Sequence, residues 1–327
     1  MKLFSATILS IVFTFGAISS AHSQGWPTQT VRLVVPFSAG GPSDLTARVV
    51  AEEMSRQLGQ AVIVENRSGA GSVLGTGVVA SAPADGHTIL FTTSSLGYMK
   101  SLVLKMSFDP ETDLIPVALI GMTPYILVTT NEFPARSLGD VVKLIRESPG
   151  KYNYGSAGTG SAMHFMFEHF MATAGGLVVT HVPYRGGGAV MTDLTGGQIE
   201  LATDPAPSTL PHLEKGSVRA IAVTSRSRLP TLPDLPTFAE SGLPEFRSFE
   251  AYGWYMTLVP SKTPAPVVAR INEAVRKAIS SPTVAKRLAE MNVEPPLENS
   301  PSSTARFLTT QFKTWADVAK RSGIKPQ

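Results

Sequence analysis

The sequence contains no cysteine among its 327 residues. This absence excludes disulfide bonds, thiol catalysis and cysteine-ligated metal sites, so packing and hydrogen bonds alone must hold the fold together. Charge is sparse and mixed: 16% of the residues are charged, the formal net charge is +3, and no block of Lys or Arg occurs. A nucleic-acid-binding face needs clustered basic residues, so we expect no nucleic-acid partner.

Nucleotide and enzyme motifs are also missing. There is no G-x-x-x-x-G-K-[ST] segment, and GAGSVLG (Gly69 to Gly75) places its last glycine one residue too far along for G-x-G-x-x-G. No serine lies in a G-x-S-x-G elbow. In HFMFEH the two histidines, His164 and His169, fall about 140° apart around a helix, which argues against a zinc pair and leaves an i, i+4 contact between His164 and Glu168. We therefore expect no cofactor and no metal.

The first 23 residues have the features of a secretory signal peptide. Lys2 gives a positive start, Leu3 to Ile18 is apolar with scattered Ser and Thr, and Ala21-His22-Ser23 has small residues at both positions that signal peptidase reads. This run is shorter than the ~20 apolar residues of a membrane-spanning helix, which favours cleavage over an uncleaved anchor. We expect a signal peptide over residues 1–23, cleavage after Ser23 and export of the rest of the chain.

Short β-branched runs alternate with segments of helical period, which predicts an α/β fold built on parallel sheets. The first series has strands near Val31 to Val35, Ala61 to Glu65 and His87 to Thr93. A second series follows Pro134 and opens with a capping-box pattern at Ser137.

Two strand-like segments, near Ile120 to Val128 and Phe249 to Val259, would connect these series as crossings between two lobes. We expect a first lobe of residues 24–123 plus 251–327 and a second lobe of residues 124–250, with the C-terminal helices returning to the first. Open α/β sheets bind ligands beyond the carboxyl ends of their strands, so the cleft between the lobes is the expected site.

The segment VVPFSAGGPSDLTAR contains a loop, Phe37 to Asp44, between a strand and a helix. Pro42 fits the first helical position, and Gly40-Gly41 lets the backbone approach a bound group closely. The N–H groups of this loop and the positive end of the helix would bind an anion. The alternative is a plain turn whose donors are satisfied by water or by Asp44.

Two further segments repeat this arrangement in the second series. YGSAGTGSAMHF, from Tyr154 to Phe165, again passes from a strand through a Ser/Gly/Thr loop into a helix. The two loops, one in each lobe, would hold an anion from both sides. THVPYRGGGAVMTDLTGGQIELATD, from Thr180 to Asp204, places three glycines before a helix and ends a strand with Asp204. Asp204 would suit an amine or hydroxyl donor on a ligand, although a single Asp is more often a cap or turn residue.

Taken in order, these segments resemble the Bug family of periplasmic solute receptors of tripartite tricarboxylate transporters. The resemblance also rests on VENRSGAGSVLGT, ADGHTILFTTSS, VRAIAVTS, LPDLPTFAESGLPEF and TPAPVVARINEAV, and it spans nearly the whole exported chain. It implies a periplasmic binding protein fold of the type II-like kind, with two α/β lobes joined by crossover strands and a ligand cleft between them.

In that family the two glycine-rich loops hold a ligand carboxylate, partly through bridging waters. Thr203 stands where relatives often have Phe, and Ser38 occupies a variable place, so the resemblance does not name the ligand. Carried over by position, it implies these ligand-binding residues: Phe37, Ser38, Ala39, Gly40, Gly41, Asp44, Thr93, Ser94, Ser156, Gly158, Thr159, Ser161 and Asp204.

The function that the resemblance implies is capture of a small carboxylate in the periplasm, without catalysis. The ligand would be a di- or tricarboxylate, an aromatic carboxylate or an amino acid, and a monomeric receptor would present it to membrane permease subunits. Two alternatives remain open: a carboxylate sensor for a signalling system, which needs the same cleft, and a secreted hydrolase using Ser156 or Ser161, which needs a His/Asp set that only the fold could assemble.

Overall fold

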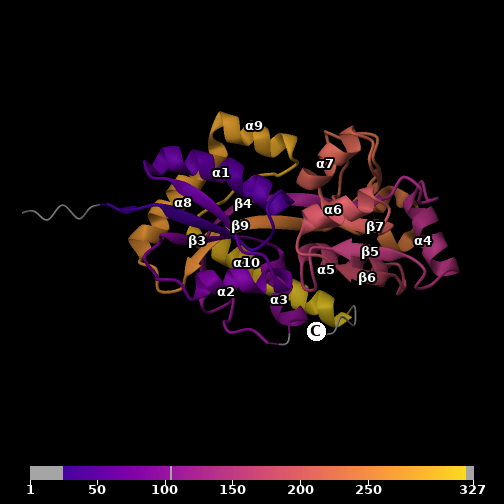
Figure 1. The fold of residues 1–327 in the computed structure, drawn as a ribbon, viewed down its shortest axis with the longest axis horizontal. Helices are drawn as coiled ribbons and strands as arrows, with labels where there is room; N and C mark the ends of the chain where they lie inside the picture. The colour runs from indigo at the N-terminus through magenta and orange to yellow at the C-terminus, as the bar shows by residue number, and fades with distance from the viewer. Residues whose placement is uncertain (1–24, 104, 322–327) are drawn as a thin grey trace, which may run out of the picture.

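The computed structural model describes residues 25–103 and 105–321, so the predicted signal peptide lies outside the described residues. They form an elongated molecule of two α/β lobes (Figure 1). The strands are β1 (Val31–Val35), β2 (Val62–Asn66), β3 (Thr88–Thr93), β4 (Leu114–Thr129), β5 (Asn153–Ser156), β6 (Thr180–Pro183), β7 (Leu201–Pro205), β8 (Arg219–Val223) and β9 (Tyr252–Pro260). The α-helices are α1 (Pro42–Leu58), α2 (Val73–Ala80), α3 (Ser95–Leu102), α4 (Leu138–Glu147), α5 (Ala162–Thr173), α6 (Gly187–Thr195), α7 (Ala206–Glu214), α8 (Ala265–Ser280), α9 (Pro282–Glu290) and α10 (Pro301–Arg321).

One mixed sheet runs through both lobes in the order β2-β1-β3-β9-β4-β7-β5-β6, and β8 pairs with β4. In the first lobe β1 pairs in parallel with β2 and β3, and β9 is antiparallel to β3. In the second lobe β5 pairs in parallel with β6 and β7. These parallel pairs confirm the α/β class that the alternation of strands and helices predicts.

The long strand β4 belongs to both lobes. It pairs with β9 as far as Pro124, and from Tyr125 onward it pairs with β7 and β8. The chain returns at Ala251, whose N–H donates to the carbonyl oxygen of Thr224 just before β9 begins. The two crossings lie side by side, because Pro124 is the register partner of Tyr252. Adjacent crossings of this kind allow the lobes to rotate about a common hinge.

The C-terminal helices α8 and α10 pack on elements of the first lobe. Helix α8 packs on α1 and β4, and α10 packs on α3 and β4. From α10, Gln311 accepts hydrogen bonds from the indole N–H groups of Trp254 on β9, at 3.0 Å, and of Trp315, at 2.8 Å. Trp315 in turn packs edge-on against Phe165 of α5 in the second lobe, with ring centroids 5.0 Å apart. Helix α10 therefore contacts both lobes.

Local signals locate most of the other elements. The capping box at Ser137 is present, because its side chain accepts from the N–H of Asp140 while the Asp140 carboxylate accepts from the N–H of Ser137. Two helices, α3 and α7, were not expected. Helix α7 carries prolines in its first turn and at Pro211, which sequence rules treat as turn signals. Among the described residues, no helix is both long and apolar enough to cross a membrane.

Candidate functional site

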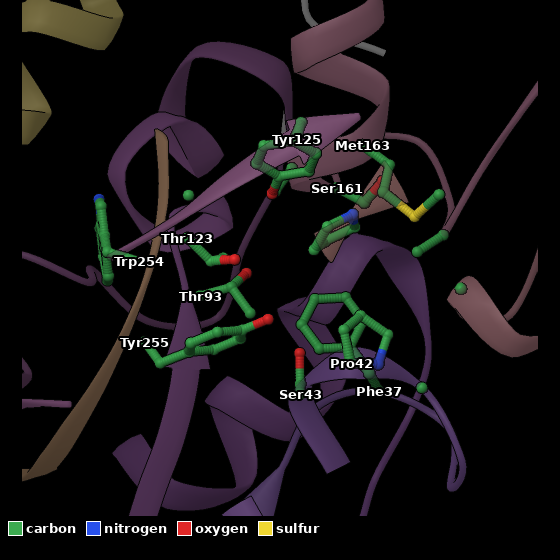
Figure 2. Close-up of a pocket in the computed structure, with 16 residues that line it drawn as sticks. Phe37, Pro42, Ser43, Thr93, Thr123, Tyr125, Ser161, Met163, Trp254 and Tyr255 are labelled. Carbon is green, nitrogen blue, oxygen red and sulfur yellow. The ribbon is translucent and has the colours of Figure 1, made fainter. Parts of the chain in front are cut away.

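A cavity lies between the lobes, against the two crossings (Figure 2). Its empty volume, which includes space open to solvent, is about 440 Å³. Of the described residues that line it, none has a charged side chain. The lining residues are Phe37, Gly41, Pro42, Ser43, Thr93, Thr123, Tyr125, Ala157, Ser161, Ala162, Met163, Gly187, Pro205, Gly253, Trp254 and Tyr255.

Four helices begin at this cavity, α1 from the first lobe and α5, α6 and α7 from the second. The first N–H groups of a helix have no intrahelical acceptor, and its N-terminus carries the positive end of the dipole. In the described part of the chain, the following buried amides at the starts of α1 and α5 donate to no protein acceptor: Gly41, Ser43, Ala162 and Met163. These amides can bind an anion without any basic side chain.

The first loop, Phe37 to Asp44, presents backbone donors and keeps its own carboxylate occupied. Asp44 accepts hydrogen bonds from the N–H of Gly40 at 2.9 Å, from the Arg48 Nε at 2.9 Å and from the Asn66 amide at 3.0 Å. Burial alone would raise the pKa of Asp44, but these donors outweigh it and hold the pKa below its usual value. Asp44 therefore stays ionised and fixes the loop around Gly40.

The second loop, Ser156 to Ser161, uses its polar groups internally. The Ser156 hydroxyl is fully buried, accepts from the N–H of Gly158 at 3.2 Å and lies 2.6 Å from the His181 Nε2. Ser161 caps helix α5 by accepting from the N–H of His164, which a hydroxyl at this position predicts. Ser156 therefore supports the loop from behind, and of these two hydroxyls only that of Ser161 belongs to the cavity wall.

Two stacked histidines lie behind the second loop, with ring centroids 4.3 Å apart. Burial lowers the pKa of His164 to about 3, with repulsion from His181 adding to it, and burial lowers the pKa of His181 to about 4. Neutral His164 accepts through Nδ1 from the N–H of Gly160 at 3.3 Å, and its Nε2 lies 3.9 Å from the Glu168 carboxylate, as the i, i+4 spacing predicts. No spacing pattern indicated these contacts of His181, because its partners Ser156 and His164 come from other elements.

The glycine run Gly186 to Gly188 brings the second lobe onto the first loop. A Cβ on Gly186 would lie 1.9 Å from the Ser38 hydroxyl, and a Cβ on Gly41 would lie 3.8 Å from the N–H of Gly188. The backbones of Gly41 and Gly188 therefore approach each other across the cleft, and Gly186 packs against the Ser38 side chain. The two lobes are in contact around the cavity, which is the closed arrangement of a two-lobed binding protein.

Asp204 is fully buried at the end of β7, directly behind the cavity wall. One carboxylate oxygen accepts from the hydroxyls of Ser208 and Thr209. The other, Oδ1, has no hydrogen-bond partner and lies 3.6 Å from where a Cβ on Gly187 would stand. Burial raises the pKa of Asp204 to about 7, although the two hydroxyls act against it. The site therefore holds a carboxyl group that ionises near neutrality.

The crossings supply an aromatic and hydroxyl-bearing wall that sequence reasoning missed. Thr123 and Tyr125 come from β4, and Trp254 and Tyr255 come from β9. Figure 2 shows the Tyr255 hydroxyl pointing into the cavity. The aromatic residues of the second crossing could have indicated this wall, because a strand beside the cleft presents side chains to it.

The structure brings some of the expected ligand-binding residues to the cavity and places others behind it. Phe37, Gly41, Thr93 and Ser161 line the cavity. Gly158 and Thr159 line a neighbouring groove between the lobes. The remaining expected residues lie outside the lining of both: Ser38, Ala39, Gly40, Asp44, Ser94, Ser156 and Asp204.

Comparison with known proteins agrees with this architecture. Residues 46–324 match the family model described as "Tripartite tricarboxylate transporter family receptor". The Bordetella pertussis protein BugT is 32% identical over 322 residues, covering 98% of this chain and 97% of BugT.

Two solved structures from Rhodopseudomonas palustris superpose over most of the chain. Rpa4515 with adipate has a TM-score of 0.87 and 36% identity, covering 92% of this chain and all of that one. MatC (Rpa3494) with bound malate has a TM-score of 0.85 and 32% identity, covering 90% of this chain and 99% of that one. These matches confirm the resemblance to the Bug receptors and the periplasmic binding protein fold: the chain belongs to the tripartite tricarboxylate transporter receptor family.

Proposed function

We propose that this receptor captures a small carboxylate in the periplasm and presents it, with the lobes closed, to the membrane subunits of a tripartite tricarboxylate transporter. The observation that carries the proposal is the set of unpaired, buried amides at the starts of α1 and α5, facing a cavity without charged side chains. Adipate and malate in two similar proteins are carboxylates of the expected size. The role requires no covalent chemistry.

The proposal assigns the two lobes to residues 24–123 plus 251–327 and to residues 124–250. The change of strand partner after Pro124 and the return at Ala251 support these boundaries. It also assigns export to the signal peptide of residues 1–23. Permease recognition would follow from closure, since only the closed state joins both lobes into one surface.

A thermal-shift screen tests the proposal. The chain from Gln24 onward is tested against mono-, di- and tricarboxylates, including adipate, malate and amino acids, with the neutral amide of each acid as its control. A ligand at ~100 times its dissociation constant adds about 2.7 kcal/mol of stability. We expect stabilisation by one class of acid and none by its amides. Equal stabilisation by acid and amide would contradict an anion site.

We further propose that the Oδ1 of Asp204 selects ligands that carry a hydroxyl or amine donor. Asp204→Asn keeps one oxygen to accept from Ser208 and Thr209 and puts an NH2 donor in place of Oδ1. It should therefore weaken binding of a hydroxylated acid such as malate by about tenfold, roughly 1.4 kcal/mol. Adipate has no such donor and serves as the matched ligand. Equal losses for both acids, measured by calorimetry, would mean that Asp204 supports the fold and does not select the ligand.

A further inference from the structure

The segment GAGSVLG has no role in the function proposed above, yet it carries the most unusual backbone of the first lobe. Four consecutive residues have positive φ: Gly69 at 145°, Ala70 at 47°, Gly71 at 59° and Ser72 at 89°. Residues other than glycine seldom adopt this region, and such strain gathers at clamps and switches when the surroundings enforce it. We call these four residues the Gly69–Ser72 turn.

The surroundings that enforce this conformation include the other lobe. A Cβ on Gly71 would lie 2.0 Å from the carbonyl oxygen of Thr159 in the second loop. From the opposite side, a Cβ on Gly158 would lie 3.5 Å from the Gly71 N. The turn and the second loop thus meet backbone to backbone, and no side chain larger than hydrogen fits at Gly71.

A chain of buried hydroxyls connects this turn to the cavity. The Ser72 Oγ lies 3.2 Å from the Ser95 Oγ, which lies 2.8 Å from the Thr93 Oγ1. Thr93 lines the cavity (Figure 2). Ser72 stands at the N-cap of α2, but its side chain does not cap that helix. If a ligand accepts the Thr93 proton, Thr93 must accept from Ser95 and Ser95 from Ser72, so all three hydroxyls take one direction.

We propose that the Gly69–Ser72 turn is the contact that completes lobe closure, held in its strained conformation by the Thr93–Ser95–Ser72 hydroxyl chain. Gly71 and Ser72 then determine how far the lobes close, and therefore the affinity, without touching the ligand. This inference rests on the proposed closure of the receptor around a ligand. In this proposal the glycines of GAGSVLG allow close contact between the lobes and do not bind phosphate.

A cross-linking experiment without ligand tests closure directly, because the chain offers a cysteine-free background. Cysteines at Ser38 and Gly186, where the ideal Gly186 Cβ is 3.2 Å from the Ser38 Cβ, report contact between the lobes. The variant S38C/G186C is oxidised in the ligand-free protein, and the rate of disulfide formation is measured. Absence of cross-linking in this parent would overturn the closed contact on which the inference rests.

Gly71→Ala is then added to the parent, with Gly59→Ala as the matched control. Both glycines have left-handed φ, 59° and 68°, but a Cβ on Gly59 meets nothing within 4 Å. We expect Gly71→Ala to slow cross-linking at least tenfold and Gly59→Ala to leave the rate within twofold of the parent. Equal rates in the two variants would overturn the proposal.

Ser95→Ala tests the hydroxyl chain, because it leaves the Ser72 hydroxyl without its partner. We expect it to slow cross-linking about threefold, and an unchanged rate would remove the chain from the proposal. No carboxylate is needed for these measurements. A protein that depends on Gly71 for closure yet binds no acid in the thermal-shift screen would contradict the proposed ligand and leave the closure contact in place.

Discussion

The two loops that face each other across the cavity differ in how many of their backbone N–H groups donate to acceptors within the protein. The first loop directs the Asp44 carboxylate to Gly40 and leaves the amides of Gly41 and Ser43 unpaired at the cavity. The second loop satisfies Gly158 through Ser156 and Gly160 through His164. The first loop therefore has its backbone donors ready for an anion, whereas the second has a fixed shape that positions the start of α5.

This difference extends to the ionisable groups behind each loop. A charged carboxylate with a lowered pKa supports the first loop, and two neutral histidines with lowered pKa values support the second. Below pH 6.5, unfolding lets these histidines take up protons, whereas the stability that Asp44 contributes is lost only at a pH below the ordinary pKa of an aspartate. Mild acid should thus act on the second loop while the first remains intact.

The largest expected effect is this pH dependence of stability. Between pH 6.5 and about 4, unfolding lets His164 and His181 each take up a proton, while Asp204, with its raised pKa of about 7, releases one. The net uptake of one proton means that the free energy of unfolding falls with falling pH, by up to about 1.4 kcal/mol per pH unit from these three groups. Over this window the loss reaches about 3 kcal/mol.

Two variants with opposite effects check the assignment in urea-unfolding titrations. His181→Phe keeps the ring stack on Tyr154 and His164 but removes one titrating group, so its slope should be lower than that of the wild type by up to about 1.4 kcal/mol per pH unit. Asp204→Asn removes the opposing group, so its slope should be steeper by a similar amount. If the free energy of unfolding had the same pH dependence in all three proteins, the pKa values of His181 and Asp204 would not be shifted by the fold.

The next effect concerns the first loop alone. Gly41→Val should weaken carboxylate binding more than tenfold, about 1.4 kcal/mol, because the branched side chain fills the space between the loop and Gly187. Gly41→Ala is the matched variant, since its added Cβ would have its nearest neighbour, the Ser38 carbonyl oxygen, at 3.5 Å. Calorimetric affinities for the Val variant equal to those of the wild type would refute the role of the first-loop amides.

The smallest expected effect concerns Ser161, which both caps α5 and lines the cavity. Ser161→Ala removes the cap of α5 and should lower the free energy of unfolding by about 1 kcal/mol, with a few-fold loss of affinity. Ser281→Ala removes the equivalent cap of α9, where Ser281 accepts from the N–H of Val284, away from the cavity. We expect both variants to lose similar stability in thermal unfolding. A ligand affinity that falls equally in both would contradict a specific role for Ser161.

Local sequence patterns predicted the strands, the crossings and both loops, because each depends on residues close together in the chain. The proline and glycines from Gly40 to Pro42, and the hydroxyl that opens α5, specify helix starts wherever they occur. The cavity wall from β4 and β9 was not predicted, because it depends on how two distant strands lie beside each other. The stack of His164 on His181 and the contact of Gly71 with Thr159 are also tertiary, and no spacing rule reaches them.

The hydrogen bonds at Gln311 have a spectroscopic consequence. Trp254 lines the cavity, Trp315 touches Phe165 of the opposite lobe, and both indoles share the Gln311 carbonyl as acceptor. The third tryptophan, Trp26, lies beside His87 at a site separate from the cavity lining. Emission from this pair should therefore shift when the cavity fills or the lobes separate. Intrinsic tryptophan fluorescence should therefore report ligand binding and lobe closure without a label, and the emission of Trp26 should stay constant.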